Sequence, residues 1–481
     1  MYDIQQEELF SFEQLMEMAD ELKFSAILNH LPIESILHAV NKKSVRGRPE
    51  SLNTRAMIYS LIIGTVQHIL FTKDLVHRLK TSSTFRKLCR FTDSDRLPSE
   101  AAYSRLITKL EQTGALQLVQ NLLVDKAITH GFLTGEVLAL DSSHLGAFDR
   151  NPKLDEKNTA ESAVPSVSEE PALLPADLCS QPAKPKPEKP KRHKRGRIPN
   201  AEKAEWRKKV EAYEASLNLF QREVADMLPA SYEELIRDMP QHPSTGVKGD
   251  PRGNRRVKYW YGYKLNLLVD TTSQYIVVGV TCSAHVSDQR PAIVLLKRLQ
   301  ERFPTLKVRY VLADKGYDGE PVYKQIRKLG AFPHIPLIHR SKLPKGVDKH
   351  FRPVCVKGKA YCYDSYDAKR ETIKFTSPKE CATCPLLNNK CQKVYKFRVA
   401  TDVRKYTVPG RGSEKAAELF KQRTAIERVF AYLKLYFGLN STRRRGKRAF
   451  VYYDLSCLTY NLCKYALDKV NKKMKLEKHA V

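Results

Sequence analysis

The sequence has no apolar run of the roughly 20 residues that a membrane-spanning helix needs. Its most apolar stretch, residues 56–72, is interrupted by Tyr59, Ser60, Thr65, Gln67 and His68. The N-terminus is acidic and lacks the basic-then-apolar order of a signal peptide. Ten cysteines in 481 residues are too few for a disulfide-stabilised scaffold. We therefore expect a cytoplasmic protein without a membrane segment.

Acidic residues are scarce relative to basic ones. Lys and Arg total 83 against 53 Asp and Glu, which gives a net charge of +30 at pH 7. Because a cationic surface attracts polyanions and releases their condensed counterions, this charge predicts a nucleic-acid partner in preference to an anionic membrane surface. Hydrophobic residues make up 42% of the chain, which is enough to bury a sizeable core and excludes global disorder.

Composition and hydrophobic periodicity divide the chain into segments. Apolar residues recur at helical spacing in 52–70 and 101–131, which predicts a helical domain that either binds DNA or serves only for packing. Residues 151–200 are rich in proline, and the run of Lys and Arg in 184–197 is typical of a phosphate-binding arm or of a solvated tail. The expected parts are a helical N-terminal DNA-binding domain (1–132), a first core strand (133–150), a Pro-rich basic linker with a helical insert (151–256), the continued core (257–330), an inserted subdomain with a cysteine cluster (331–412) and a C-terminal helical part of the core (413–481).

The continued core has the pattern of an α/β protein. The β-branched and aromatic runs 258–270 and 274–284, separated by Thr-Thr-Ser, predict a β-hairpin. An apolar helix, a strand and a second helix follow. The order predicts a strand meander followed by a crossover to a parallel strand.

Two aspartates come directly after apolar strand patterns. Asp141 closes Val-Leu-Ala-Leu-Asp, and Asp314 closes Val-Arg-Tyr-Val-Leu-Ala-Asp. In open α/β sheets reactive groups gather at the carboxyl ends of strands, although strand ends also often carry turn or helix-capping aspartates. Each aspartate alone is more typical of a cap, whereas the two together in a basic protein point to a site with a third acid.

A third acid lies in the segment 420–450. If this segment is read as a helix, it has an apolar face, and the polar residues follow the pattern Phe420-x2-Arg423-x3-Glu427-x6-Lys434. An amphipathic helix with an ordinary Arg–Glu pair would produce part of the same pattern.

With these motifs the chain resembles the DDE transposases of bacterial insertion sequences, in the branch marked by Y-x2-R-x3-E-x6-K. Phe420 replaces the tyrosine of that signature and removes one hydroxyl. The segments that carry the resemblance are Asp-Ser-Ser-His from Asp141, residues 260–270, residues 313–319 and, for the N-terminal domain, residues 85–106. The resemblance implies an α/β fold with an RNase H-like mixed-sheet core and an insertion, preceded by an all-α N-terminal domain.

The resemblance also implies the activity and its residues. Such enzymes cut the ends of their element and join the 3′-hydroxyls to target DNA with two Mg²⁺ or Mn²⁺ ions, for which carboxylates are the preferred ligands. Asp141 would bridge both ions, and Asp314 and Glu427 would each hold one. Arg423 and Lys434 would contact phosphates near the cleaved end, beside Phe420. The expected partner is double-stranded DNA, bound by a homodimer.

Several other residues near these motifs each allow two interpretations. The cluster Arg443, Arg444 and Arg445 favours contact with the DNA backbone over a solvated loop. Asp318 fits a turn better than a spare metal ligand, and Trp260 fits a core position better than a base-stacking one. His144 and His285 fit polar strand ends better than metal ligands. The rival functions are a catalytically inactive DNA-binding repressor and a metal-dependent nuclease without joining activity.

Half of the cysteines gather in the segment between Asp314 and Glu427. Cys355, Cys362, Cys381, Cys384 and Cys391 include one Cys-x2-Cys knuckle, which is compatible with a structural Zn²⁺ site. The pattern has only one such knuckle and offers five cysteines for four positions, so reduced structural thiols are the alternative.

Overall fold

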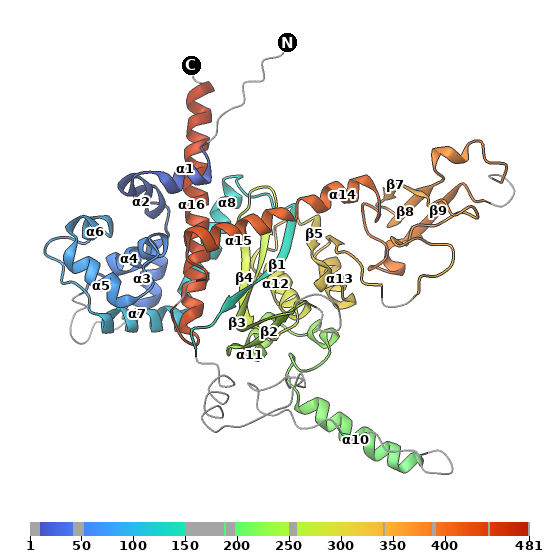
Figure 1. Cartoon of the computed structure of the whole chain (residues 1–481), viewed down its shortest axis with the longest axis horizontal. Coiled ribbons are helices and arrows are strands. Elements are labelled where there is room, and N and C mark those ends of the chain that lie inside the picture. The colour runs from blue at the N-terminus through green and yellow to red at the C-terminus, as the bar shows by residue number, and fades with distance from the viewer. Residues whose placement is uncertain are drawn as a thin grey trace, which may run out of the picture.

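The computed structural model of the chain describes residues 10–41, 52–149, 187–188, 198–249, 257–339, 342–386, 391–440 and 443–479 (Figure 1). Most of the proline-rich stretch and of its basic run lies outside these residues. None of the helices in the described ranges combines the length and apolar character that a transmembrane span requires.

The N-terminal region is helical. Ser11, Asn53 and Ser99 cap helices through side-chain oxygens that accept backbone N–H groups, so local sequence signals set these starts. The helices are α1 (Phe12–Glu17), α2 (Asp20–Leu28), α3 (Ile33–Val40), α4 (Thr54–Val66), α5 (Thr72–Thr81), α6 (Ser83–Leu88), α7 (Glu100–Thr113) and α8 (Ala115–Thr129).

A mixed sheet forms the centre of the molecule. Its strands are β1 (Val137–Gly146), β2 (Ser244–Lys248), β3 (Lys258–Asp270), β4 (Ile276–Ser283), β5 (Tyr310–Ala313) and β6 (Phe332–His334). Strand β3 pairs antiparallel with β1, β2 and β4, whereas β1, β5 and β6 are parallel neighbours. The predicted hairpin of β3 and β4 is confirmed. This is the RNase H-like strand order, and the predicted fold class is confirmed.

Helices cover the sheet. Helix α12 (Gln289–Arg302) packs on β3 and β4, and α13 (Glu320–Lys328) follows the short 3₁₀ helix η2 (Lys315–Tyr317) and packs against β6. Helix α15 (Thr424–Tyr436) crosses β1 and β3 (Figure 1). The long helix α16 (Arg448–His479) contacts α2, α4, α7 and α8 as well as β4, so one hydrophobic core joins the N-terminal helices to the sheet.

The segment between α13 and the C-terminal helices forms a second, smaller sheet. It contains β7 (Cys362–Asp367), β8 (Thr372–Thr376) and β9 (Val394–Arg398), with η3 (Lys379–Cys381) and η4 (Val399–Thr401) at its ends. A separate small core is built on Tyr361, Ile373, Phe375, Val399 and Val408. Figure 1 shows this subdomain at one end of the molecule, next to α14 (Glu414–Lys421).

The inserted region before β2 is also partly helical. It contains α10 (Asn200–Ser216), η1 (Val224–Met227) and α11 (Tyr232–Asp238). Helix α10 buries none of its residues, in agreement with the charges that alternate along its sequence. Trp206 Nε1 of this helix donates a hydrogen bond to the Pro187 carbonyl at 3.3 Å.

Two details of the sequence interpretation are wrong. Strand β1 does not end at Asp141 but continues to Gly146, because β3 pairs with it along this whole length. The segment 420–450 is not one helix: α14 and α15 are offset at Gln422, and α15 ends at Tyr436. Gly438 then adopts φ of 59°, in the left-handed region that suits glycine and reverses the chain direction.

A carboxyl group of α16 yields a pH-dependent prediction. Asp454 accepts a hydrogen bond from Gln117 Nε2 at 3.2 Å. Burial raises the pKa of Asp454 to about 6, against the opposing effects of Gln117 and of the Arg298 charge. A raised pKa means that the folded protein binds more protons than the unfolded chain, so stability falls as pH rises between about 4 and 6.

We therefore expect Asp454→Asn to stabilise the protein above pH 6, by about 1–2 kcal/mol. Below about pH 4 Asp454 is largely protonated in both the folded and the unfolded state, so the difference in stability between the parent and the variant should vanish. Urea unfolding at pH 7.5 and at pH 4 measures both values. A variant that is less stable than the parent at pH 7.5 would contradict the proposed cost of the buried charge.

Candidate active site

Two of the predicted acids lie side by side on the sheet. Strands β1 and β5 run parallel, and the last paired residues are Leu140 and Ala313. Asp141 and Asp314 are the next residue on each strand. The parallel register therefore brings together two side chains that are far apart in the sequence.

The third acid is connected to the first by an arginine. Glu427 lies in the first turn of α15, and Arg423 precedes it by one helical turn. Arg423 Nη1 donates to Asp141 Oδ2 at 3.1 Å, and its Nη2 donates to Glu427 Oε1. The guanidinium thus bridges both carboxylates, and only 17% of its side chain is exposed. One cation holds the helix-borne acid against the strand-borne acid.

The electrostatic environment of Asp141 is that of a crowded acidic site. Burial is the main cause that raises the pKa of Asp141 above its ordinary value, and the charges of Asp314 and Asp288 raise it further. The Ser142 N–H group and the Arg423 guanidinium act in the opposite direction. The carboxylate form therefore depends on nearby cations, as expected where like charges meet in a partly buried place.

Asp314 also caps the next turn. Its carboxylate accepts the Lys315 N–H at 2.6 Å and begins η2. The capping interpretation and the active-site interpretation of this residue are therefore compatible, since one carboxylate oxygen is enough for the cap.

Phe420 and Lys434 occupy opposite ends of this helical segment. Phe420 lies on α14 with its ring centroid 5.9 Å from the Arg423 guanidinium, so it supports Arg423 by a cation–π contact in place of a hydroxyl contact. Lys434 is exposed near the end of α15. Burial of its stem and the Lys248 charge lower the pKa of Lys434, and Asp141 raises it. A basic surface therefore borders the acids.

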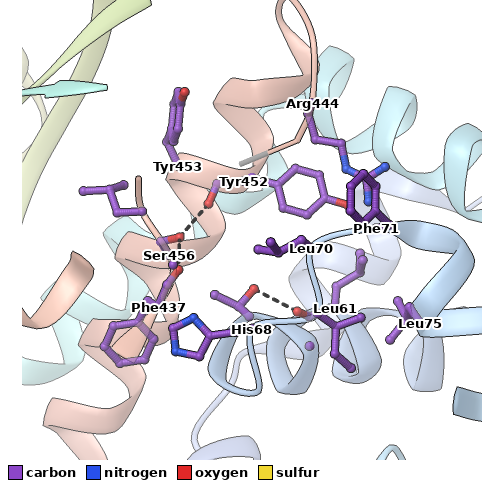
Figure 2. A pocket seen from close by; sticks show the side chains of 15 residues that line it. Leu61, His68, Leu70, Phe71, Leu75, Phe437, Arg444, Tyr452, Tyr453 and Ser456 are labelled. Atoms are coloured by element: carbon purple, nitrogen blue, oxygen red, sulfur yellow. Dashed lines mark hydrogen bonds between the residues drawn. The ribbon is translucent and has the colours of Figure 1, made fainter. Parts of the chain in front are cut away.

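The three arginines after α15 do not behave alike. Arg443 and Arg445 flank the Phe148 ring, at 5.4 and 5.5 Å from its centroid. Arg444 instead turns towards the helical region and lies 4.7 Å from the Tyr452 ring centroid. Figure 2 shows it at the edge of a pocket between α4, α5 and the start of α16, with Phe71 and Leu61. Among the three, Arg443 and Arg445 are exposed and Arg444 is partly buried.

Other residues with two interpretations have defined surroundings. Asp318 is fully buried and accepts two hydrogen bonds from the Arg404 guanidinium, both at 2.7 Å. His144 and Trp260 lie together, with ring centroids 4.9 Å apart. Burial, followed by the charge of Lys248, lowers the pKa of His144. His285 Nδ1 is 2.8 Å from Ser244 Oγ.

The sequence interpretation missed a further charged pair at this site. Asp288, immediately before α12, lies 2.9 Å from Lys264 Nζ of β3. Ser142 Oγ donates to the same carboxylate at 3.3 Å. The only sequence signal was an aspartate before a helix, which is a common cap, so its place beside Asp141 could not be read from the pattern.

Four of the five clustered cysteines lie near one another. Burial raises the pKa of Cys381, and Cys355, Cys384 and Cys391 are close enough for their charges to raise it further. The Lys359 N–H group points to Cys355 Sγ at 3.4 Å. Cys362 is exposed at the start of β7.

A DDE transposase domain implies a divalent metal ion. Among the residues that the structure describes, no group of three or more His, Cys, Asp or Glu side chains is arranged so that it could hold a metal ion. Neither the three acids nor the clustered cysteines form such a group. Among the acids, Arg423 lies between Asp141 and Glu427. The donor chemistry of Asp141, Asp314 and Glu427, all carboxylates, still suits a hard ion such as Mg²⁺.

Comparison with known proteins gives two family matches. A family model for the transposase DDE domain matches residues 238–462, and a second one for a transposase domain, DUF772, matches residues 10–109. No curated protein matches at a significant level. The chain is also similar to the cryo-EM structure of a piggyBac transposase synaptic complex with hairpin DNA, at 12% identity, over 96% of this chain and 77% of that chain. The TM-score of 0.35 is too low for that similarity to carry an argument. The chain therefore carries a transposase DDE domain in residues 238–462, preceded by a transposase domain of the DUF772 family in residues 10–109.

Proposed function

We propose that this protein is an active transposase of a bacterial insertion sequence, in the branch with the Y-x2-R-x3-E-x6-K helix. It binds the ends of its element as a homodimer, cleaves them and joins the 3′-hydroxyls to target DNA in the bacterial cytoplasm. One observation carries the proposal: Asp141 and Asp314 are neighbours on parallel strands, and Arg423 ties Glu427 to Asp141.

The proposed catalytic residues are Asp141, Asp314 and Glu427. These carboxylates would hold divalent ions, which when bound would supply activation of the attacking oxygen and stabilisation of the leaving oxygen. The chain itself supplies two parallel strands that orient two of the acids, Asp141 within β1 and Asp314 just after β5, and the helix that brings the third. Arg423 compensates the charge of Asp141 and Glu427 in the free protein. When bound cations neutralise Asp141 and Glu427 instead, the Arg423 guanidinium would be available to bind a phosphate.

The basic surface beside the acids supports double-stranded DNA as the partner. Lys434 and Lys248 are close enough for their charges to interact, and both act on His144. Such mutual repulsion between cations is relieved when a phosphate backbone lies between them. The exposed Arg443 and Arg445 add positive charge at Phe148, shortly after the end of β1.

The first prediction for this function concerns the acids. We expect Asp141→Ala, Asp314→Ala and Glu427→Ala each to abolish cleavage of labelled element ends in the presence of Mg²⁺. Binding to these ends should change little, because phosphate contacts come from other residues. Glu136→Ala is the matched control, since Glu136 immediately precedes β1 and forms an exposed ion pair with Arg309.

Adding a target plasmid to the same reaction separates the three possible activities. Joined products support the transposase. Cleavage without joining identifies a nuclease, and binding without cleavage identifies an inactive repressor. Retained cleavage in a purified acid variant removes that residue from the catalytic set.

The second prediction concerns Lys434. Replacing it by Gln should weaken binding to element ends and lower the slope of log K against log salt by about one unit, because each neutralised phosphate releases about one counterion. Lys374→Gln provides the control: it removes the same charge, but Lys374 is paired with Asp364 at 3.0 Å on the second sheet. Equal slopes for the parent and the Lys434 variant would show that this side chain makes no phosphate contact.

For the cysteine cluster we propose a Zn²⁺ ion bound by Cys355, Cys381, Cys384 and Cys391, with Cys362 outside the set. Their mutual proximity supports this choice, although the thiols would have to move together on binding. The ion would stabilise a segment whose own hydrophobic core is small.

Elemental analysis of protein purified without chelator should therefore find one zinc per chain. Cys384→Ser should lose the zinc and become protease-sensitive near residues 350–395, whereas Cys362→Ser should keep it. A content well below one zinc per chain in the parent protein means that these cysteines are reduced thiols.

A further inference from the structure

The aspartate before α12 is in a capping position but does not cap. Asp288 is the N-cap residue of α12, where an aspartate normally accepts a backbone N–H group of the first helical turn. Its side chain makes no such hydrogen bond. Instead, its Oδ1 accepts from Lys264 Nζ at 2.9 Å and from Ser142 Oγ at 3.3 Å. The Asp288 carboxylate therefore connects the start of α12 to β3 and β1 and leaves the helix without a side-chain cap.

Lys264 is held firmly in place for this contact. Its Nζ also donates to the Val286 carbonyl at 2.9 Å and lies 6.0 Å from the Trp260 ring centroid. Only 13% of the Lys264 side chain is exposed. The Asp288 side chain is 32% exposed, so the pair is partly buried, and breaking it leaves the remaining partner with a charge that solvent screens only in part.

The other oxygen of Asp288 faces the loop that carries Asp314. A methyl group added to Gly316 would lie 3.4 Å from Asp288 Oδ2, and one added to Gly319 would overlap the Gln289 side chain. Loop 314–319 therefore rests on the first residues of α12. The charge of Asp288 also reaches the acids, since it raises the pKa of Asp141.

We propose that Asp288 and Lys264 are a positioning pair for the active site, which sets the separation of Asp141 and Asp314 while remaining electrically neutral as a unit. Asp288 accepts a hydrogen bond from Ser142 of β1 and lies next to Gly316 in the Asp314 loop. Lys264 cancels the charge that Asp288 would otherwise add to the three acids. The proposal rests on the proposed function and adds two residues to it that make no contact with substrate.

Single and double variants test the pair through metal binding, measured by calorimetric titration of the full-length protein with Mn²⁺. Asp288→Asn leaves the Lys264 charge uncompensated beside the acids, so it should weaken Mn²⁺ binding at least about tenfold. Lys264→Met leaves an extra negative charge and should bind Mn²⁺ no more weakly than the parent. The double variant should recover part of the loss seen in Asp288→Asn, because the uncompensated charge is gone, but should still bind Mn²⁺ more weakly than the parent, because the contacts of the pair are gone as well.

Cleavage of element ends is measured on the same protein samples. Asp288→Asn should lose activity at low Mn²⁺ and recover it at high Mn²⁺, whereas a side chain needed only for folding would give no such rescue. The control is Asp468→Asn, which breaks a similarly buried pair with Lys464, 2.8 Å apart on α16. It should lower the melting temperature and leave Mn²⁺ binding unchanged.

Two outcomes would overturn the pair while leaving the proposed function intact. One is Mn²⁺ binding by Asp288→Asn equal to that of the parent. The other is a double variant as weak as Asp288→Asn, which would make Asp288 a direct ligand. A parent protein that neither binds Mn²⁺ nor cleaves element ends would instead overturn the proposed function, and the pair with it.

Discussion

Mutual repulsion between carboxylates is the constraint on which the rest of this site depends. The parallel register of β1 and β5 places Asp141 beside Asp314, and α15 adds Glu427. Like charges in a partly buried place are unstable unless cations compensate them. Arg423 supplies that compensation on the α15 side of the sheet, and Lys264 does so for Asp288 at α12. The basic residues that border the acids are therefore part of the site's stability as well as candidates for binding DNA.

The loop that carries Asp314 is fixed from two directions. On the α12 side, Gly316 and Gly319 lie next to Asp288 and Gln289. At its end, the buried Asp318 is held by the guanidinium of Arg404, which belongs to the segment after β9. The second sheet is thus connected to the acid-bearing loop by a charge-assisted, two-bond contact. This connection gives a physical route by which the inserted subdomain affects the geometry of Asp314.

The N-terminal helices are also tied to the core. Helix α16 packs against α2, α4, α7 and α8, and the same continuous hydrophobic core includes the buried face of the sheet. Gly438 and Arg444 line the same pocket as His68 from the N-terminal helical region and Tyr452 from α16. Figure 2 shows the side chains of Arg444, His68 and Tyr452 around it. The helix that bears Glu427 is therefore fixed at its C-terminal end by residues from the first part of the chain.

The sequence by itself determined the class of fold, the family and the three acids as candidates, because strand patterns, helical spacing and short motifs are local properties of the chain. It could not determine that β1 continues past Asp141, since that depends on hydrogen bonds to β3. Nor could it reveal Asp288, whose local context is that of an ordinary cap and whose partners, Lys264 and Ser142, come from other strands. Only the tertiary structure decides which charges meet, because the energy of a charge depends on neighbours that the fold, and not the sequence order, brings within a few ångströms.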